Sequence, residues 1–391
     1  MSFPMNVIIA SSKRTAVGRG VKGSLRFTRP EDLGAAALQG ALAAVPGLKA
    51  EDVDDVVLGC AMPEASQGFN VARNIVFRAQ WPDSVPAETI NRFCSSGLQA
   101  IAHAAQTIQC GLADVVIAGG VESMSMVPMG GFNPSMHPVM MDERPEVYIG
   151  MGHTAERVAA RYNVSRADQD AFAVLSHDRA QAAIKAGLFK DEIIPLMATT
   201  FDGKKFGTAL FEIDECPRAG TSLEGLSQLR PAFTNGGTVT AGNSSPLSDG
   251  GAASVLLSEA RAEKLGVKPL GRMRGFAVAG LAPDVMGIGP VPAIRKLLAQ
   301  TGLTIGDIDL FEINEAFAAQ AVYCGRELGI SHLKLNATGG AIALGHPLGC
   351  TGAKLTATIL HALKRTGGRF GIVSMCIGGG MGAAGLFEVT H

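Results

Sequence analysis

Gly47-Leu-Lys-Ala-Glu-Asp-Val-Asp54 and Gly302-Leu-Thr-Ile-Gly-Asp-Ile-Asp309 are two versions of one segment. Each follows a stretch with the apolar spacing of an amphipathic helix, and the two lie 255 residues apart (302 − 47). The same offset joins Gly97 to Gly352, and each of these glycines opens a helical stretch that leads to an apolar run and then to glycines. A repeat of this length indicates that one structural unit occurs twice in the chain.

The first copy of this unit carries an insertion. Both copies end alike, in Gly251-Ala-Ala-Ser-Val-Leu-Leu257 and Gly382-Ala-Ala-Gly-Leu-Phe-Glu388, but these endings are only 131 residues apart (382 − 251). The difference between the two offsets is 124 residues (255 − 131), which the first copy has and the second lacks. The composition of the sequence changes to Met, Pro and polar residues at about 121–245, which is where we place the 124 extra residues. Within this insertion the spacing of apolar residues predicts at least one helix, over 168–186.

Both copies alternate helices with short runs rich in Val and Ile, the pattern of β-α-β units on a central sheet. The sequence therefore predicts an α/β protein with two pseudo-symmetric halves and an inserted loop domain. The first half takes residues 1–120 and 246–270, the loop domain takes 121–245, and the second half takes 271–391. Chains rich in Gly and Ala can show internal sequence similarity by chance. Several matching segments at one offset and a shared ending argue against chance here.

Composition excludes several classes of function. The chain has 391 residues, enough for two or three domains. Its 34 Lys and Arg balance 35 Asp and Glu, so no overall field would recruit a polyanion, and one Trp and three Tyr argue against nucleic-acid binding. No apolar run is long enough to predict a membrane span, and the N-terminal residues do not read as a secretion signal, so a cytoplasmic protein is expected.

The seven cysteines are dispersed without a C-x-x-C pair, which makes a disulfide framework or a metal site improbable. Cys94 stands out in Asn91-Arg-Phe-Cys94-Ser-Ser-Gly, between a strand-like segment, 87–90, and a helix start. Free amides and the helix macrodipole at such a position favour a thiolate, so we expect a lowered thiol pKa and amides that bind an oxyanion. The plainer alternative is a small buried cysteine at a tight turn.

Three further motifs carry candidate chemistry. His346, in a glycine-rich loop before Pro347, could take a proton from a thiol or donate to a carbonyl, or could simply cap a helix. Cys376, in Ser374-Met-Cys376-Ile-Gly-Gly-Gly, ends an apolar strand of the second copy. Asn314 stands where a strand passes into a helix, and it either caps that helix or holds a water or substrate oxygen.

Together these motifs resemble the thiolase family, and the resemblance covers essentially the whole chain. It is carried by the order C-S-S-G, N-E-A-F, G-H-P-x-G and C-I-G-G-G, with support from Gly119-Gly-Val-Glu-Ser-Met-Ser and Thr240-Ala-Gly-Asn-Ser-Ser-Pro. The resemblance implies the cleavage of a 3-ketoacyl-CoA by CoA, through an acyl-Cys94 intermediate, in fatty-acid β-oxidation. CoA would be a substrate, and no permanently bound cofactor or metal is expected.

The resemblance also implies roles for individual residues. Cys94 would be the nucleophile, His346 its activator, and Cys376 the acid/base. His346 and a water held by Asn314 would form one oxyanion pocket, and the amides of Cys94 and Gly378 would form the other. The implied contacts to CoA are Arg218 near the adenine, Phe233 and Ser245 along the pantetheine arm, and Met151, Met286 and Phe317 in the acyl or pantetheine channel.

The residue at position 150 bears on whether the chain resembles biosynthetic or degradative thiolases. Short-chain biosynthetic thiolases carry a histidine just before a Met-Gly-x-Thr-Ala-Glu segment, whereas here Gly150 precedes 151–156. The chain thus resembles degradative thiolases more closely, and the condensation of two acetyl-CoA is the alternative. Further alternatives are a decarboxylating ketoacyl synthase, which uses two histidines, and a non-catalytic acyl-CoA-binding subunit.

A homodimer or dimer of dimers is expected from the resemblance, and a hydratase/dehydrogenase subunit is a candidate partner.

Overall fold

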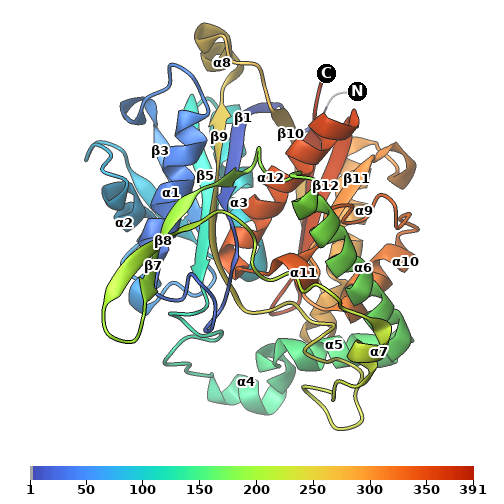
Figure 1. Ribbon diagram of the computed structural model, residues 1–391. Helices are drawn as coiled ribbons and strands as arrows, with labels where there is room; N and C mark the ends of the chain where they lie inside the picture. The colour runs from blue at the N-terminus through green and yellow to red at the C-terminus, as the bar shows by residue number, and fades with distance from the viewer. Residues whose placement is uncertain (1–2) are drawn as a thin grey trace.

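The computed structural model describes residues 3–391 and contains one large mixed sheet, drawn in Figure 1. Its main strands follow the order β11-β12-β13-β10-β1-β9-β5-β3-β4. They are β1 (Val7–Thr15), β3 (Asp55–Gly59), β4 (Ala87–Ile90), β5 (Val115–Ser123), β9 (Ser248–Leu257), β10 (Gly271–Gly280), β11 (Leu310–Ile313), β12 (Phe370–Ile377) and β13 (Met381–Glu388). Two short strands lie off this path, β2 (Gly18–Arg19) beside β9 and β6 (Ile193–Ile194) beside β1.

The strand order is symmetric about the antiparallel pair formed by β1 and β10. Read outward from that pair, β1-β9-β5-β3 corresponds to β10-β13-β12-β11, and in each half the last pair is parallel while the inner pairs are antiparallel. β11 begins 255 residues after β3 (310 − 55), the offset found in the sequence. The predicted duplication of an α/β unit is confirmed.

Helices complete the layers around the sheet. In the two halves they are α1 (Pro30–Ala43), α2 (Val71–Arg78), α3 (Ser96–Gln109), α8 (Glu259–Leu265), α9 (Pro290–Thr301), α10 (Ala318–Glu327), α11 (Ala341–Leu344) and α12 (Leu348–Thr366). α3 and α12 lie in the middle, since Ile101 and Ile359 share a core with Val116 of β5 and Val373 of β12. α1 covers the outer face of the first half and α9 that of the second, which gives α-β-α-β-α layering.

The repeated glycines allow α3 and α12 to approach closely. A Cβ atom added at Gly352 would lie 2.2 Å from the amide nitrogen of Leu98. A Cβ atom at Gly97 would lie 2.8 Å from the carbonyl oxygen of Gly349. Both distances are shorter than van der Waals contact, so a side chain at either position would force the two helices apart.

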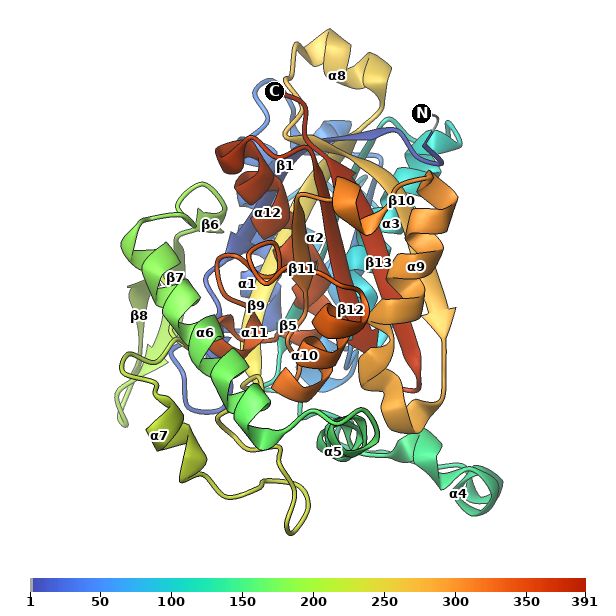
Figure 2. The same cartoon turned by 90° about the vertical axis from the view of Figure 1, so that its right-hand side faces the viewer.

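The segment between β5 and β9 leaves the sheet and packs along one side of the molecule (Figure 2). It contains α4 (Pro138–Glu143), α5 (Met151–Arg161), α6 (Arg166–Lys185), α7 (Leu223–Ser227) and the hairpin β7 (Leu196–Phe201) and β8 (Phe206–Phe211). The helix expected over 168–186 is α6, which begins with a capping box between Ser165 and Asp168. The domain boundaries stay a prediction. Among residues 3–391, no helix combines the length and apolarity that crossing a membrane requires.

Candidate active site

Cys94 lies between β4 and α3, the position between a strand and a helix start that the sequence predicted, and the chain makes a tight turn there. Phe93, the residue before it, has a φ of 43°, in the left-handed region that side chains rarely adopt. The hydroxyl of Ser96 closes the turn, since it accepts from the Arg92 amide at 2.9 Å and donates to the Phe93 carbonyl at 2.7 Å. Strain of this kind persists only where surrounding contacts hold it, and it concentrates at functional sites.

The pKa of the Cys94 thiol differs from the sequence prediction. Burial raises this pKa to about 12, while the amides of Cys94 and Gly378 lower it and the charge of Glu122 raises it. The prediction of a lowered pKa is therefore wrong for this structure, because the loss of water outweighs the two amide contacts. A protonated thiol needs a base to take its proton when it attacks a carbonyl.

His346 is buried between α11 and α12, and hydrogen bonds hold both of its ring nitrogens. Nδ1 lies 2.6 Å from the hydroxyl oxygen of Thr351, which itself donates to the carbonyl oxygen of Pro347 at 2.9 Å. The Thr351 hydroxyl must then accept from Nδ1–H, so the network assigns the proton to Nδ1 and leaves Nε2 unprotonated. Burial, and then the charge of Lys354, lower the pKa of His346 to about 3, so the ring is a neutral base.

Asn314 contacts His346 and does not cap a helix. Its amide nitrogen donates to Nε2 of His346 at 3.2 Å. The capping interpretation is wrong, because α10 begins at Ala318 and Phe317 occupies the N-cap position. The side-chain oxygen of Asn314 is buried and has no hydrogen-bond partner within residues 3–391. An unpaired buried acceptor is costly, so this atom suits a water or a ligand group that donates to it.

Cys376 lies at the end of β12 and is 1% exposed. Burial raises the pKa of its thiol, and the neighbouring Cys94 and Cys324 raise it further. Cys94 comes from the first half of the molecule and Cys376 from the second, so the duplication brings two thiols together. Cys376 packs with Met286, Phe317 and Met151, the three residues that the resemblance placed in the substrate channel.

The glycine loop after Cys376 completes this surface. A Cβ atom at Gly378 would lie 3.5 Å from the sulfur of Met151 and 3.9 Å from the ring of Phe93. The Gly378 amide contacts the Cys94 thiol, as noted above. Met151 therefore lies next to Gly378, whose amide is one of the two expected to bind an oxyanion.

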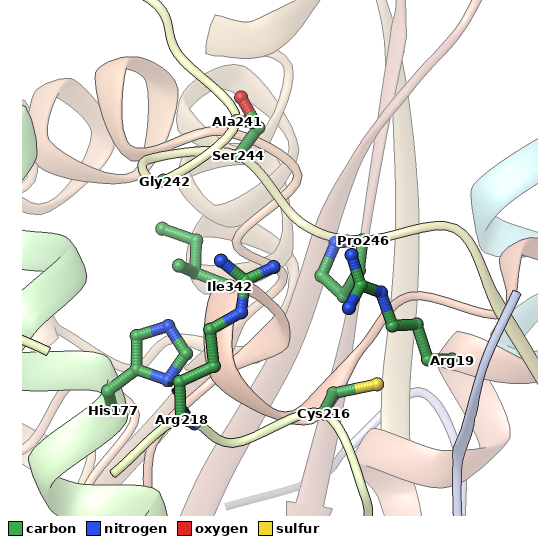
Figure 3. Close-up of a pocket in the computed structure, with 9 residues that line it drawn as sticks. All are labelled: Arg19, His177, Cys216, Arg218, Ala241, Gly242, Ser244, Pro246 and Ile342. Atoms are coloured by element: carbon green, nitrogen blue, oxygen red, sulfur yellow. Dashed lines mark hydrogen bonds between the residues drawn. The ribbon is translucent and has the colours of Figure 1, made fainter. Parts of the chain in front are cut away.

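The remaining predicted CoA contacts divide into two groups. The ring of Phe233 meets that of Phe317 edge to face at 5.9 Å, and the Ser245 hydroxyl donates to the Ala316 carbonyl at 3.0 Å, so both adjoin the apolar cluster around Cys376. Arg218 instead lines a cavity with His177, Arg19 and loop residues that include Ser244 and Pro246, the neighbours of Ser245 (Figure 3).

Sequence reasoning missed the residues that hold the catalytic candidates in place. The buried Glu122 carboxylate accepts from the amides of Gly349 at 2.7 Å and Ala61 at 2.8 Å and from the side chain of Gln67 at 2.7 Å. It therefore ties the end of β5 to the first turn of α12, directly after His346. The amide of His346 also donates to the Ser248 hydroxyl at 3.0 Å. The sequence does contain a feature that could have pointed to Glu122, because it is an acidic residue at the end of an apolar run.

Fold and site together define an acyl-transfer enzyme built from two copies of one α/β unit. The family model described as thiolase, N-terminal domain matches residues 7–260, and that described as thiolase, C-terminal domain matches residues 267–389. This chain belongs to the thiolase family, a family of acyltransferases, which confirms the resemblance found in the sequence.

Relatives and solved structures match over nearly the full length. The 3-ketoacyl-CoA thiolase of Bacillus subtilis is 53% identical, over 98% of this chain and 99% of the relative. The peroxisomal 3-ketoacyl-CoA thiolase A of Mus musculus is 47% identical, over 98% of this chain and 91% of the relative. The structure of human mitochondrial 3-ketoacyl-CoA thiolase superposes with a TM-score of 0.90 at 39% identity, covering 99% of both chains. The structure of the Bacillus anthracis acetyl-CoA acetyltransferase superposes with a TM-score of 0.90 at 41% sequence identity, covering 100% of both chains.

Proposed function

We propose that this chain is a 3-ketoacyl-CoA thiolase of fatty-acid β-oxidation, which converts a 3-ketoacyl-CoA and CoA to acetyl-CoA and a shortened acyl-CoA. The observation that carries the proposal is the meeting of Cys94 and Cys376, from opposite halves, where Cys94 also packs against Leu348, two residues after the neutral His346. Full-length similarity to proteins named 3-ketoacyl-CoA thiolase supports the same conclusion.

The first half-reaction forms the acyl-enzyme. Nε2 of His346 takes the proton of Cys94, and the sulfur attacks the keto carbon of the substrate. The bond between the α carbon and the keto carbon then breaks, and its electron pair leaves with the acetyl-CoA enolate. Cys376 donates its proton to the enolate carbon, which gives acetyl-CoA and leaves Cys376 as a thiolate.

The second half-reaction releases the acyl group. The Cys376 thiolate takes the proton of the incoming CoA thiol, and the CoA sulfur attacks the acyl-Cys94 carbonyl. Cys94 leaves and regains its proton from His346, which restores the resting enzyme. The amides of Cys94 and Gly378 would stabilise the tetrahedral oxyanion, and His346 with a water on Asn314 would stabilise the enolate oxygen.

In this proposal CoA is a substrate and no cofactor stays bound. Met151, Met286 and Phe317 belong to the same apolar cluster as Cys376, so they suit the thioester end of the pantetheine arm. Phe233 and Ser245 adjoin that cluster, and Arg218 lines a cavity with Ser244 and Pro246, the neighbours of Ser245, so Arg218 suits the adenine end of the same molecule.

Thiolysis measured with 3-ketoacyl-CoAs of increasing chain length tests the function. We expect CoA-dependent cleavage of substrates longer than acetoacetyl-CoA, because Gly150 stands where short-chain biosynthetic enzymes carry histidine. The second candidate is acetyl-CoA condensation, which similarity to a structure named acetyl-CoA acetyltransferase favours. Activity restricted to acetoacetyl-CoA would establish that candidate instead, and decarboxylation of a malonyl thioester without thiolysis would exclude both.

We further propose that the enzyme is a cytoplasmic homodimer, either alone or with a hydratase/dehydrogenase subunit. All seven cysteines are free, which suits a reducing compartment. Within the described residues 3–391, strand β4 ends the sheet with an unpaired edge, and around it Phe69 is 96%, Phe77 48% and Phe93 38% exposed. Apolar side chains beside an open strand edge favour pairing with a second copy.

A further inference from the structure

Glu315, the residue after Asn314, has a buried carboxylate that joins three separate parts of the chain. Its Oε2 accepts from the hydroxyl of Ser176, on α6 of the inserted segment, at 2.6 Å and from the amide of Ile342 in α11 at 3.2 Å. Its Oε1 accepts from the side-chain amide of Asn336 at 2.8 Å. Glu315 is 1% exposed, and a carboxylate is costly to bury, yet no step of the acyl-transfer cycle uses this one.

The surrounding chain is shaped around this carboxylate. A Cβ atom at Gly340 would lie 2.1 Å from the carboxylate carbon, so only glycine leaves room for it. The Gly340 amide donates to the Ser176 hydroxyl at 3.1 Å. Asn336 cannot turn its side-chain amide over, because its Oδ1 accepts from the Ile313 amide at 2.9 Å. These contacts orient the hydroxyl of Ser176 and the NH2 group of Asn336 towards Glu315.

Asn314 depends on this anchor more than His346 does. The ring of His346 is held by Thr351, and its backbone amide is held by Ser248. Within residues 3–391 the side chain of Asn314 makes one hydrogen bond, the contact of 3.2 Å to His346, and its Oδ1 has no partner. The position of the Asn314 side chain is therefore set by its own backbone, which Glu315 holds at the next residue.

We propose that Glu315 is a positioning residue that holds Asn314 in the oxyanion pocket of the enolate. The inference rests on the proposed thiolase reaction, because that reaction forms an enolate at this place. The other oxyanion pocket consists of the amides of Cys94 and Gly378, and among the described residues neither amide is hydrogen-bonded to Glu315. Loss of the anchor should therefore slow enolate formation much more than acyl transfer, because a displacement of about 1 Å is enough to cost a large part of a rate.

Two exchange reactions of acetyl-CoA separate these steps. Transfer of isotopically labelled CoA into acetyl-CoA passes through acetyl-Cys94 and needs no enolate. Uptake of deuterium from D2O into the acetyl methyl group does need it. The Cys376 thiolate that remains when CoA departs removes a methyl proton from a second bound acetyl-CoA, and after exchange with solvent the thiol returns a deuteron to the enolate carbon. The ratio of deuterium uptake to CoA exchange thus reports on the enolate pocket and does not depend on the amount of folded enzyme.

Three variants carry the test. Glu315→Gln keeps the shape but sets an NH2 group against a fixed donor, and we expect deuterium uptake to fall about 10- to 100-fold and CoA exchange less than about threefold. Ser176→Ala removes one anchor and keeps the charge, so the ratio should fall about threefold or more. Glu192→Gln is the matched control, because Glu192 is also a buried carboxylate but binds Arg14, at 2.6 Å. It should lower stability and leave the ratio unchanged.

The ratio must fall in Ser176→Ala for the proposal to stand, and it must fall further in Glu315→Gln if that variant folds. Equal losses of both exchanges leave the ratio unchanged and overturn the proposal, because the carboxylate then only supports the fold. A wild-type enzyme that catalyses neither exchange contradicts the proposed function, and this role of Glu315 with it. A wild-type enzyme that catalyses both, with an unchanged ratio in the variants, contradicts the role of Glu315 alone.

Discussion

At the residue scale, Thr351 decides which nitrogen of His346 carries the proton. Its hydroxyl lies between Nδ1 and the Pro347 carbonyl, at 2.6 and 2.9 Å. Thr351→Val removes the acceptor for Nδ1–H, so the proton can move to Nε2 and the base is lost. We expect kcat for thiolysis to fall roughly 10- to 100-fold with little change in KM. Thr351→Ser keeps the hydroxyl and should stay near the wild-type rate; equal losses in both variants would show a packing role only.

The protonation of Cys94 gives a second residue-scale prediction. Its pKa of about 12 means that the thiolate is scarce at neutral pH and grows as pH rises towards that value. The rate at which iodoacetamide alkylates Cys94 in the free enzyme should therefore rise about tenfold per pH unit from pH 7 to 10. Peptide mass spectrometry distinguishes Cys94 from the exposed Cys110. A rate that levels off near pH 7 would instead reveal the low pKa that the sequence suggested.

At the scale of elements, Glu122 connects β5 to the start of α12. Its carboxylate accepts from Gly349, Ala61 and Gln67, and these bonds fix the turn that follows His346. Glu122→Gln keeps the shape but loses the charge and half of the acceptor capacity, so we expect the free energy of unfolding to fall by about 3 kcal/mol. Urea unfolding measures this, with the exposed Glu263→Gln as control. Unchanged stability would mean that the amides find other partners.

The same elements show what the sequence could and could not reveal. The strand β4, the turn at Cys94 and the following helix were predictable, because apolar spacing and glycine are local signals. The contact from Glu122 to Gly349 joins residues 227 positions apart, and no local pattern reports it. The direction of the Cys94 pKa shift was missed for a related reason. The helix start is visible in the sequence, but the burial that outweighs it comes from packing between the two halves.

At the scale of the whole molecule, the pseudo-twofold axis explains why the candidate site lies where it does. The axis passes between β1 and β10, so α3 and α12 meet at the centre, each close to one catalytic motif. Cys94 lies just before α3 and His346 just before α12, and the helices can meet because Gly97 and Gly352 carry no side chain. The site is thus a junction between two copies of one unit, and neither half could form it alone.

The pairing of two molecules through β4 that we propose would extend this dependence beyond the single chain. Phe69 is 96% exposed and has a φ of 53°, a strained conformation that leaves its ring in water unless a second copy covers it. The double variant Phe69→Asp, Phe77→Asp should convert the dimer to a monomer at micromolar concentration. Since β4 leads directly into the Cys94 turn, the monomer should also lose most of its thiolysis activity.

Sedimentation and activity measured on the same samples test this prediction. Leu333→Asp is the matched control, because Leu333 is 73% exposed and lies beyond α10 in the second half, away from β4. It should change neither mass nor rate. A wild-type enzyme that is active while strictly monomeric would contradict pairing through β4. A monomeric double variant with full activity would keep the interface but separate it from catalysis, because the turn at Cys94 would then be held by contacts within one chain, such as those of Ser96.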